Sequence, residues 1–232
     1  MDARTFSEED QMLFAELSGD RNALHVNPLE ARRTLFGRQV VHGIHLLLWS
    51  LETVLTKPCR LTKLNVTFGR PVGVNEPVSC HVVRADGNAM DIVLESRGAK
   101  CCSIRIEVAD DDLQGAVVLS GTPPQTVARV MEPADIGNAQ GELDLYCDQD
   151  RWRLLFGSRG QRLQPSQIAL LLASTRLVGM ECPGAHSIYS QIILTFPPSA
   201  ENERPAMKWR VETFDARFGR VAMKVAALGY SG

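Results

Sequence analysis

The feature that most restricts the fold of this chain is residues 40–55 (VVHGIHLLLWSLETVL), a segment that is apolar on nearly every side. A helix on a protein surface shows one apolar stripe, whereas a helix that is apolar all round is buried. Four segments with strand-like alternation follow it. One buried helix followed by a meander of strands predicts an α+β fold in which the sheet wraps around the helix. The inward-facing residues of the four segments are Leu64, Val66 and Phe68; Val78, Cys80 and Val82; Met90, Ile92 and Leu94; and Cys102, Ile104, Ile106 and Val108.

The second half of the chain repeats this plan weakly. Residues 166–179 (SQIALLLASTRLVG) predict another very apolar helix, capped by Ser166 and stopped by Gly179. In both halves the helix leads to a proline and then to a strand that ends in Thr-Phe, PCRLTKLNVTF in one and PGAHSIYSQIILTF in the other. Similarity at a period near 125 residues, read from these segments, indicates a duplicated fold.

The duplication divides the chain into three parts. Residues 1–112 form the first half, residues 113–141 form a connection rich in proline, glycine and acidic residues, and residues 142–232 form the second half. The second half shows three strand patterns after its helix, whereas the first half shows four. Either AVVLS at 116–120 supplies the missing strand, or the chain ends early and the second half is truncated.

Composition narrows the classes of function. With 44% hydrophobic and 22% charged residues, the chain can build a core without metal or disulfide. A net charge of −2 argues against nucleic acid as the main partner, because phosphate binding needs a basic face. Six cysteines without a C-x-x-C pair, a polar N-terminus and no apolar run long enough to span a bilayer predict a cytoplasmic protein with no membrane partner.

The polar stretch LSGDRNALHVN, residues 17–27, lies directly before the most apolar helix. Asp20 and His25 are five positions apart, which suits a loop better than one helix face. Ser7 and Gly19 are expected to cap the helix that precedes this loop, and Pro28 to open a short helix over 28–36. A solvated polar loop is one interpretation. An acid/base pair that holds one water is the other.

The wider segment FAELSGDRNALHVNPLEARRTLFGRQVVHGIHLL, residues 14–47, resembles the signature of the MaoC-like (R)-specific enoyl-CoA hydratases. The usual form of that signature is F-A-x-x-S-G-D-x-N-P-x-H-x-D, followed by an alanine, a phenylalanine and I-x-H-G. The spacing from Asp20 to His42 is 22 residues (42 − 20), as in the family. The resemblance implies the hot-dog fold, an antiparallel sheet wrapped round one long helix, and here a double hot-dog with two antiparallel sheets, each wrapped around a long buried helix.

Site residues follow from the resemblance position by position. It implies that Asp20 and His25 are the catalytic pair that activates water, and that Asn22 orients their loop. It also implies that the backbone N–H of Gly43 binds the thioester oxygen, at a helix start where the macrodipole favours negative charge. His42 matches the histidine that precedes this glycine and is expected to be structural.

The segment departs from the signature at positions that bear on the acyl pocket. Ala23 replaces the motif proline and Asn27 replaces the second aspartate. Where some relatives carry a serine, the chain has Leu51, with Ser50 beside it as a substrate-binding candidate.

The second half lacks the signature altogether. Alignment on the prolines puts its equivalent of His-Gly at Gln167–Ile168, so the chain is expected to have one catalytic and one degenerate half.

These features predict reversible hydration of a trans-2-enoyl thioester to an (R)-3-hydroxyacyl thioester, as in fatty acid metabolism, without metal or redox cofactor. The resemblance implies CoA or an acyl carrier protein as the thiol, and it leaves a homodimer of double hot-dogs open. Two alternatives remain. One is a hot-dog thioesterase that uses Glu52, the one acidic residue on the buried helix. The other is a non-catalytic acyl-binding protein, in which Asp20 and His25 would not face a common cavity.

Overall fold

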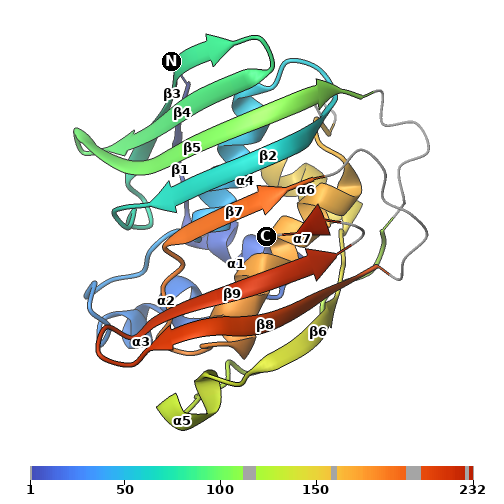
Figure 1. Cartoon of the computed structure of the whole chain (residues 1–232). Coiled ribbons are helices and arrows are strands. Elements are labelled where there is room, and N and C mark those ends of the chain that lie inside the picture. Colours follow the sequence, from blue (N-terminus) through green and yellow to red (C-terminus); the bar gives the residue numbers. More distant parts are fainter. Residues whose placement is uncertain (1, 112–118, 158–160, 197–204, 228–229, 232) are drawn as a thin grey trace.

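Ten antiparallel strands form one continuous curved sheet (Figure 1) in this computed structural model, which describes residues 2–111, 119–157, 161–196, 205–227 and 230–231. The strand order is β1-β3-β4-β5-β2-β7-β10-β9-β8-β6, so the strands of the two halves of the chain occupy the two ends of the sheet. The strands are β1 (Asp2–Thr5), β2 (Cys59–Phe68), β3 (Pro77–Asp86), β4 (Ala89–Ser96), β5 (Ala99–Asp110), β6 (Gln140–Asp144), β7 (Gln191–Thr195), β8 (Ala206–Asp215), β9 (Arg220–Ala227) and β10 (Tyr230–Ser231).

The longest helices lie on the inner side of the curved sheet (Figure 1). The longest are α1, α4 and α7, and the core consists mainly of apolar side chains between α4, α7 and the sheet. The helices are α1 (Glu8–Ser18), α2 (Ala23–Val26), α3 (Pro28–Ala31), α4 (Gly43–Val54), α5 (Pro133–Ile136), α6 (Gln149–Phe156) and α7 (Pro165–Arg176), and the π-helix η1 (Leu177–Glu181) continues α7.

Pairing between β2 and β7 joins the two halves. The strands are antiparallel with Lys63 opposite Thr195 and Val66 opposite Ile192. Beside this junction, the buried amide of Gln167 on α7 accepts from the Leu61 N–H at 2.9 Å and donates to the Leu61 carbonyl at 2.8 Å. The contact lies next to the irregularity of β2 between Leu61 and Lys63. A helix of the second half is therefore tied to a strand of the first.

The α+β class, the antiparallel strands and a buried helix within residues 40–55 are confirmed, although α4 begins at Gly43 rather than at residue 40. The expected two sheets are instead one, because β2 of the first half pairs with β7 of the second. Ser7 caps α1 through a reciprocal pair of hydrogen bonds with Asp10, and Gly19 ends that helix in a left-handed conformation with φ of 78°. The strand residues named above face the core, except that Val82 is 45% exposed at the irregularity of β3 between Val82 and Arg84. No helix within the described residues combines the length and the apolar character needed to cross a bilayer.

The region between the first two long helices was predicted less well. A one-turn helix, α2, occupies part of the expected loop, because the Asn22 side chain accepts from the Leu24 N–H at 3.1 Å and starts a turn. Conversely, α3 ends at Ala31 rather than near residue 36. Only Ala31 of α3 is buried, so little packing supports a longer helix.

The start and end predicted for the second buried helix were wrong. Gln164 precedes α7 and Pro165 is its first residue, so Ser166 lies inside the first turn and is not the cap. Gly179 does not stop the helix, because the chain continues through η1 to Glu181, closed by a bond from the Cys182 N–H to the Leu177 carbonyl. Pro165 suits a first position because its missing N–H would have no acceptor in the helix.

The second half contributes five strands to the sheet as described. β6 pairs with β8 at the edge, and β10 lies between β7 and β9. The expected strand AVVLS falls largely on residues 112–118, outside the described residues, and residues 119–120 carry no strand.

Truncation of a buried leucine on α4 tests the position of that helix. Leu47 is fully buried, whereas Leu154 on α6 is 73% exposed. We expect Leu47→Ala to lower the free energy of unfolding by about 2–5 kcal/mol, because it removes a packed side chain and leaves a cavity. The matched change Leu154→Ala should alter it by no more than about 0.5 kcal/mol. Urea denaturation measures both, and equal losses would contradict a core built on α4.

Candidate active site

The site begins at the sharp turn that follows α1. Gly19 takes the left-handed conformation, and a Cβ built on it would lie 2.7 Å from the Pro123 Cβ and 2.8 Å from the Arg176 Cδ. A side chain at this position would therefore collide with two neighbours and strain the backbone. The turn directs Asp20 inward, where it is only 2% exposed.

Both carboxylate oxygens of Asp20 accept hydrogen bonds. Oδ1 accepts from the Asn22 N–H at 3.1 Å, and Oδ2 accepts from the Thr175 hydroxyl at 2.6 Å. Burial raises the pKa of Asp20, while the charge of His25 and these two hydrogen bonds act in the opposite direction. One of the two donors belongs to the same turn as Asp20, and the other comes from α7 in the second half.

His25 lies on α2, and one of its ring nitrogens already has a hydrogen-bond partner. Its Nδ1 lies 2.8 Å from the Val40 carbonyl, which can only accept, so Nδ1 carries the proton in this contact and Nε2 is left to act as a base. A ring nitrogen of His25 and a carboxylate oxygen of Asp20 lie within 4.8 Å of each other. Two hydrogen bonds that meet at one water span about 4.5 Å, so this separation suits a shared water.

His42 lies behind this pair as a buried support. Its ring stacks on that of His25 with centroids 3.9 Å apart. Nδ1 lies 2.9 Å from the Gln11 side-chain oxygen and Nε2 lies 3.0 Å from the Asp20 carbonyl. Burial lowers the pKa of His42 well below its usual value. These two contacts hold the ring in the core between α1 and the turn at Asp20.

Gly43 is the first residue of α4, where a backbone N–H has no acceptor within the helix. A Cβ built on this glycine would lie 3.0 Å from the Phe68 ring, so the ring covers the residue closely. The N–H of Gly43 lies at the positive end of the α4 macrodipole and can bind an oxygen that develops negative charge.

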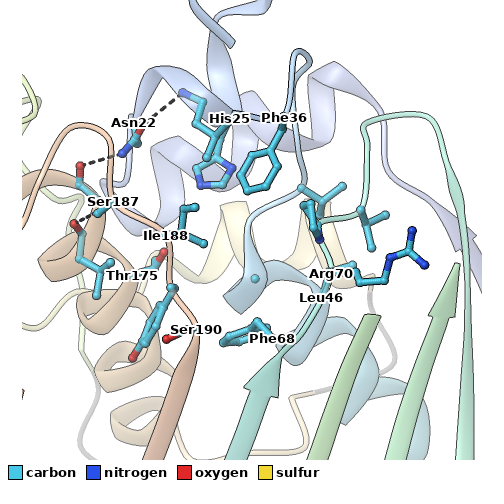
Figure 2. A pocket seen from close by; sticks show the side chains of 18 of the residues that line it. Asn22, His25, Phe36, Leu46, Phe68, Arg70, Thr175, Ser187, Ile188 and Ser190 are labelled. Carbon is cyan, nitrogen blue, oxygen red and sulfur yellow. Dashed lines mark hydrogen bonds between the residues drawn. The ribbon is translucent and has the colours of Figure 1, made fainter. Parts of the chain in front are cut away.

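Asp20, His25 and Gly43 line one cavity of about 350 Å³. Figure 2 shows His25 and Phe36 at the top of it, with Ser187, Ile188 and Thr175 from the second half at the left. Its remaining walls are largely apolar. The wall residues include Val41, Leu46, Phe68, Val72 and Tyr189.

Asp20, His25 and His42 are also residue types that can bind a metal ion. Within the described residues, Asp20, His25 and His42 each place a potential ligand atom within 4.8 Å of the others. Coordination by His42 would cost one of its two contacts, with the Gln11 oxygen or with the Asp20 carbonyl. The observed orientation of His42 therefore suits a support for an acid/base pair better than a metal ligand.

Comparison with known proteins identifies the family. Residues 1–98 match the MaoC like domain. The chain is 31% identical over 115 residues to the 3-hydroxybutyryl-CoA dehydratase of Methylorubrum extorquens, a match that covers 47% of this chain and 70% of the relative. The chain belongs to the MaoC-like dehydratase family.

Solved structures extend the MaoC-like fold over both halves. A putative MaoC domain protein dehydratase from Chloroflexus aurantiacus superposes with a TM-score of 0.64 at 14% identity, covering 98% of this chain and 84% of its own. A MaoC-like dehydratase from Phytophthora capsici gives 0.58 at 13% identity, covering 99% and 92%. At these identities the likeness shows the fold alone.

The structure brings together four of the six residues predicted for this MaoC-like site. Asp20, His25, Asn22 and Gly43 all line the cavity. Asn22 also donates through Nδ2 to the Gly179 carbonyl at 3.2 Å, so it ties the turn at Asp20 to the second half. His42 supports the pair from behind.

Ser50 is not brought to the cavity. It is fully buried, two turns further along α4 than Gly43, and its hydroxyl donates to the Leu47 carbonyl at 2.7 Å. Its hydrogen bond is satisfied inside its own helix, so nothing directs it toward a substrate. A substrate-binding role for Ser50 is not supported by this geometry.

The proline alignment also placed the start of the second helix three residues too late. The counterpart of His42–Gly43 at the start of α7 is Gln164–Pro165 rather than Gln167–Ile168. Proline has no N–H, so this helix start lacks the donor that Gly43 supplies in the first half. The catalytic signature is therefore missing from the second half in backbone chemistry as well as in side chains.

Sequence reasoning missed Thr175 and Gly179. Thr175 is buried beside Ser174 and Arg176, and these three polar residues interrupt an apolar run that begins at Ile168 and resumes at Leu177. Three consecutive buried polar residues require partners, and that interruption was the available signal. Gly179 lies against Asp20, and a Cβ built on it would be 2.3 Å from the Asp20 Oδ1.

Substitution of Gly179 tests this close approach. We expect Gly179→Ala to lower the free energy of unfolding by about 1–3 kcal/mol, because the new methyl group must displace the Asp20 carboxylate or η1. Gly137→Ala is the matched control, since no atom lies within 4 Å of a Cβ built there. Denaturant unfolding compares the two, and a crystal structure of Gly179→Ala with both Asp20 and η1 unmoved would contradict the packing described.

Proposed function

We propose that this chain is a hydro-lyase that adds water reversibly to a trans-2-enoyl thioester and forms an (R)-3-hydroxyacyl thioester. The observation that carries the proposal is the placement of Asp20 and His25 within 4.8 Å of each other on a cavity that Gly43 also lines. Membership of the MaoC-like family supports the reaction class. The thiol is CoA or an acyl carrier protein, and no metal or redox cofactor enters the proposal.

The residues divide the reaction between them. In the hydration direction, a water between Asp20 and the His25 Nε2 gives its oxygen to Cβ, and one member of the pair takes the proton that the water loses. The electron pair of the double bond moves onto the thioester, whose oxygen accepts a hydrogen bond from the Gly43 N–H. The other member of the pair then delivers a proton to Cα. The two groups are a coupled acid/base pair, which leaves the individual roles open.

The double hot-dog organisation belongs to this proposal. The first half supplies the acid/base pair and the oxyanion donor. The second half supplies another wall of the cavity and the Thr175 hydroxyl, which donates a hydrogen bond to Asp20. One complete site per chain follows, because the start of α7 carries Pro165 where α4 carries Gly43.

The thioesterase alternative is not favoured. Glu52 has its pKa raised to about 7 by burial, which would suit a base. However, its side chain accepts a hydrogen bond from the Arg162 N–H at 3.2 Å, at the far end of α4 from Gly43. It is not among the residues that line the cavity with Asp20. A non-catalytic role is disfavoured because the pair faces a common cavity.

Removal of either member of the pair tests the reaction. We expect Asp20→Asn and His25→Ala each to lower kcat/KM for hydration of crotonyl-CoA or longer enoyl-CoAs by about 10²–10⁴-fold, because general acid/base catalysis contributes that much. The loss of enoyl absorbance follows the reaction. Glu52→Gln is the control and should retain activity. Full activity in both pair variants, or release of free thiol that depends on Glu52, would contradict the proposal.

A second cavity favours acyl groups longer than the four carbons of a crotonyl chain. It has a volume of about 690 Å³, lies between α7, β7 and β9, and shares Val178 and residues 187–190 with the catalytic cavity. Tyr189 lies on the shared boundary, with its ring 5.7 Å from that of Phe68. An acyl chain that passes this boundary would bury its methylenes against Leu170, Leu177 and Ile192.

Obstruction of the second cavity tests this path. Val225 lines the second cavity and not the first. We expect Val225→Trp to lower kcat/KM for a ten-carbon enoyl-CoA by about tenfold or more, because each excluded methylene forfeits about 0.8 kcal/mol of burial. Activity on crotonyl-CoA should stay within about twofold of the unmodified enzyme. Parallel assays across chain lengths measure the ratio, and an equal effect on both substrates would exclude this route for the chain.

A further inference from the structure

Thr175 makes the shorter of the two hydrogen bonds to the Asp20 carboxylate. It does so from the half that lacks the MaoC-like signature. The hydroxyl donates to Oδ2 at 2.6 Å across 155 residues of sequence. Thr175 is 4% exposed and Asp20 is 2% exposed, so water does not compete for this contact. A hydroxyl bonded to a buried carboxylate stabilises the charged form strongly.

We propose that Thr175 is a positioning residue for the catalytic carboxylate, which orients Asp20 toward the water shared with His25 and keeps it ionised. This inference rests on the proposed function and assigns a part of that site to the second half. The Asn22 N–H holds Oδ1, so together the two donors fix the plane of the carboxylate. Each oxygen keeps a second lone pair, which is available to a water in the cavity.

The other polar groups near Asp20 do not replace this donor. From α2, His25 faces the carboxylate across the space for a water. From the start of α4, the His42 Nε2 lies 4.0 Å from Oδ2 and 3.0 Å from the Asp20 carbonyl, so its short contact is with the backbone. From the second half, η1 presents the bare backbone of Gly179, and Arg176 donates to the Asp144 carbonyl.

Comparison of the two long helices sharpens the assignment. α4 and α7 each contain 12 residues, and Thr53 and Thr175 both occupy the eleventh position. The Thr53 hydroxyl donates to the Trp49 carbonyl at 2.8 Å, the ordinary bond of a helical threonine to the preceding turn. Thr175 instead directs its hydroxyl out of the helix to Asp20. Thr53 is therefore a matched control that differs in its partner.

The pH dependence of hydration tests the proposal. Removal of the hydroxyl withdraws a hydrogen bond from the ionised carboxylate, so the proton on Asp20 is held to higher pH. We expect Thr175→Val to move the acidic limb of kcat/KM upward by about one pH unit, while Thr175→Ser and Thr53→Val keep the limb of the unmodified enzyme. If protonated Asp20 is the active form, the basic limb moves upward instead. Thr175→Ala adds no new contact and serves if Thr175→Val does not fold.

A second measurement does not depend on turnover. The ¹³C resonance of the Asp20 carboxyl group, assigned by its loss in Asp20→Asn, reports the titration directly. We expect its midpoint to rise in Thr175→Val and to be unchanged in Thr175→Ser and Thr53→Val. An unchanged midpoint in Thr175→Val, or a rise in Thr175→Ser equal to that in Thr175→Val, would overturn the proposal. An unmodified enzyme that hydrates no enoyl-CoA would contradict the proposed function alone, because the titration still tests Thr175.

Discussion

Burial of the Asp20 carboxylate is the constraint on which the arrangement of this molecule depends. An ionised carboxylate taken out of water is strongly destabilised unless donors or opposite charge compensate it. Here the compensation is divided, because the turn after α1 provides the Asn22 N–H and the second half provides the Thr175 hydroxyl. The two halves must therefore meet in one fixed position, or Asp20 loses a donor while it remains enclosed. The bare backbones of Gly19 and Gly179 follow from the same enclosure, since a Cβ at either would enter occupied space.

The sheet supplies that fixed position. A shift of one residue in the pairing of β2 with β7 would turn every side chain of one strand to the opposite face. Leu64 and Val66 of β2 and Ile192 and Leu194 of β7 are all buried, so such a shift would expose the row of apolar side chains on whichever strand moved. The clamp of Gln167 on Leu61 then holds α7 to the same strand. Register, helix position and the place of Thr175 are thus linked through β2.

The features that could be predicted from the sequence are those that local chemistry determines. The Ser7 cap, the Gly19 stop and the all-round apolarity of residues 40–55 specify α1 and α4, and the Asp20 and His25 motif specifies one side of the cavity. The rest depends on contacts between distant residues. Gly179 predicts a helix end when it is considered alone, yet the chain there continues as η1 with Asp20 packed on it. The partner of Thr175 lies 155 residues away, and no spacing rule within α7 could have named it.

The two twelve-residue helices explain why a half without the signature is retained in the site. At the first position, Gly43 offers an N–H that Pro165 lacks. At the eleventh position, Thr175 meets a carboxylate, whereas Thr53 bonds to its own helix. In the proposed reaction each helix therefore contributes a different end of a shared arrangement: α4 contributes the N–H for developing negative charge, and α7 contributes the hydroxyl that supports the carboxylate. Because the two ends belong to opposite halves, the proposed site is complete only when both halves are present. A second half without the signature therefore still carries the Thr175 hydroxyl that the proposal requires.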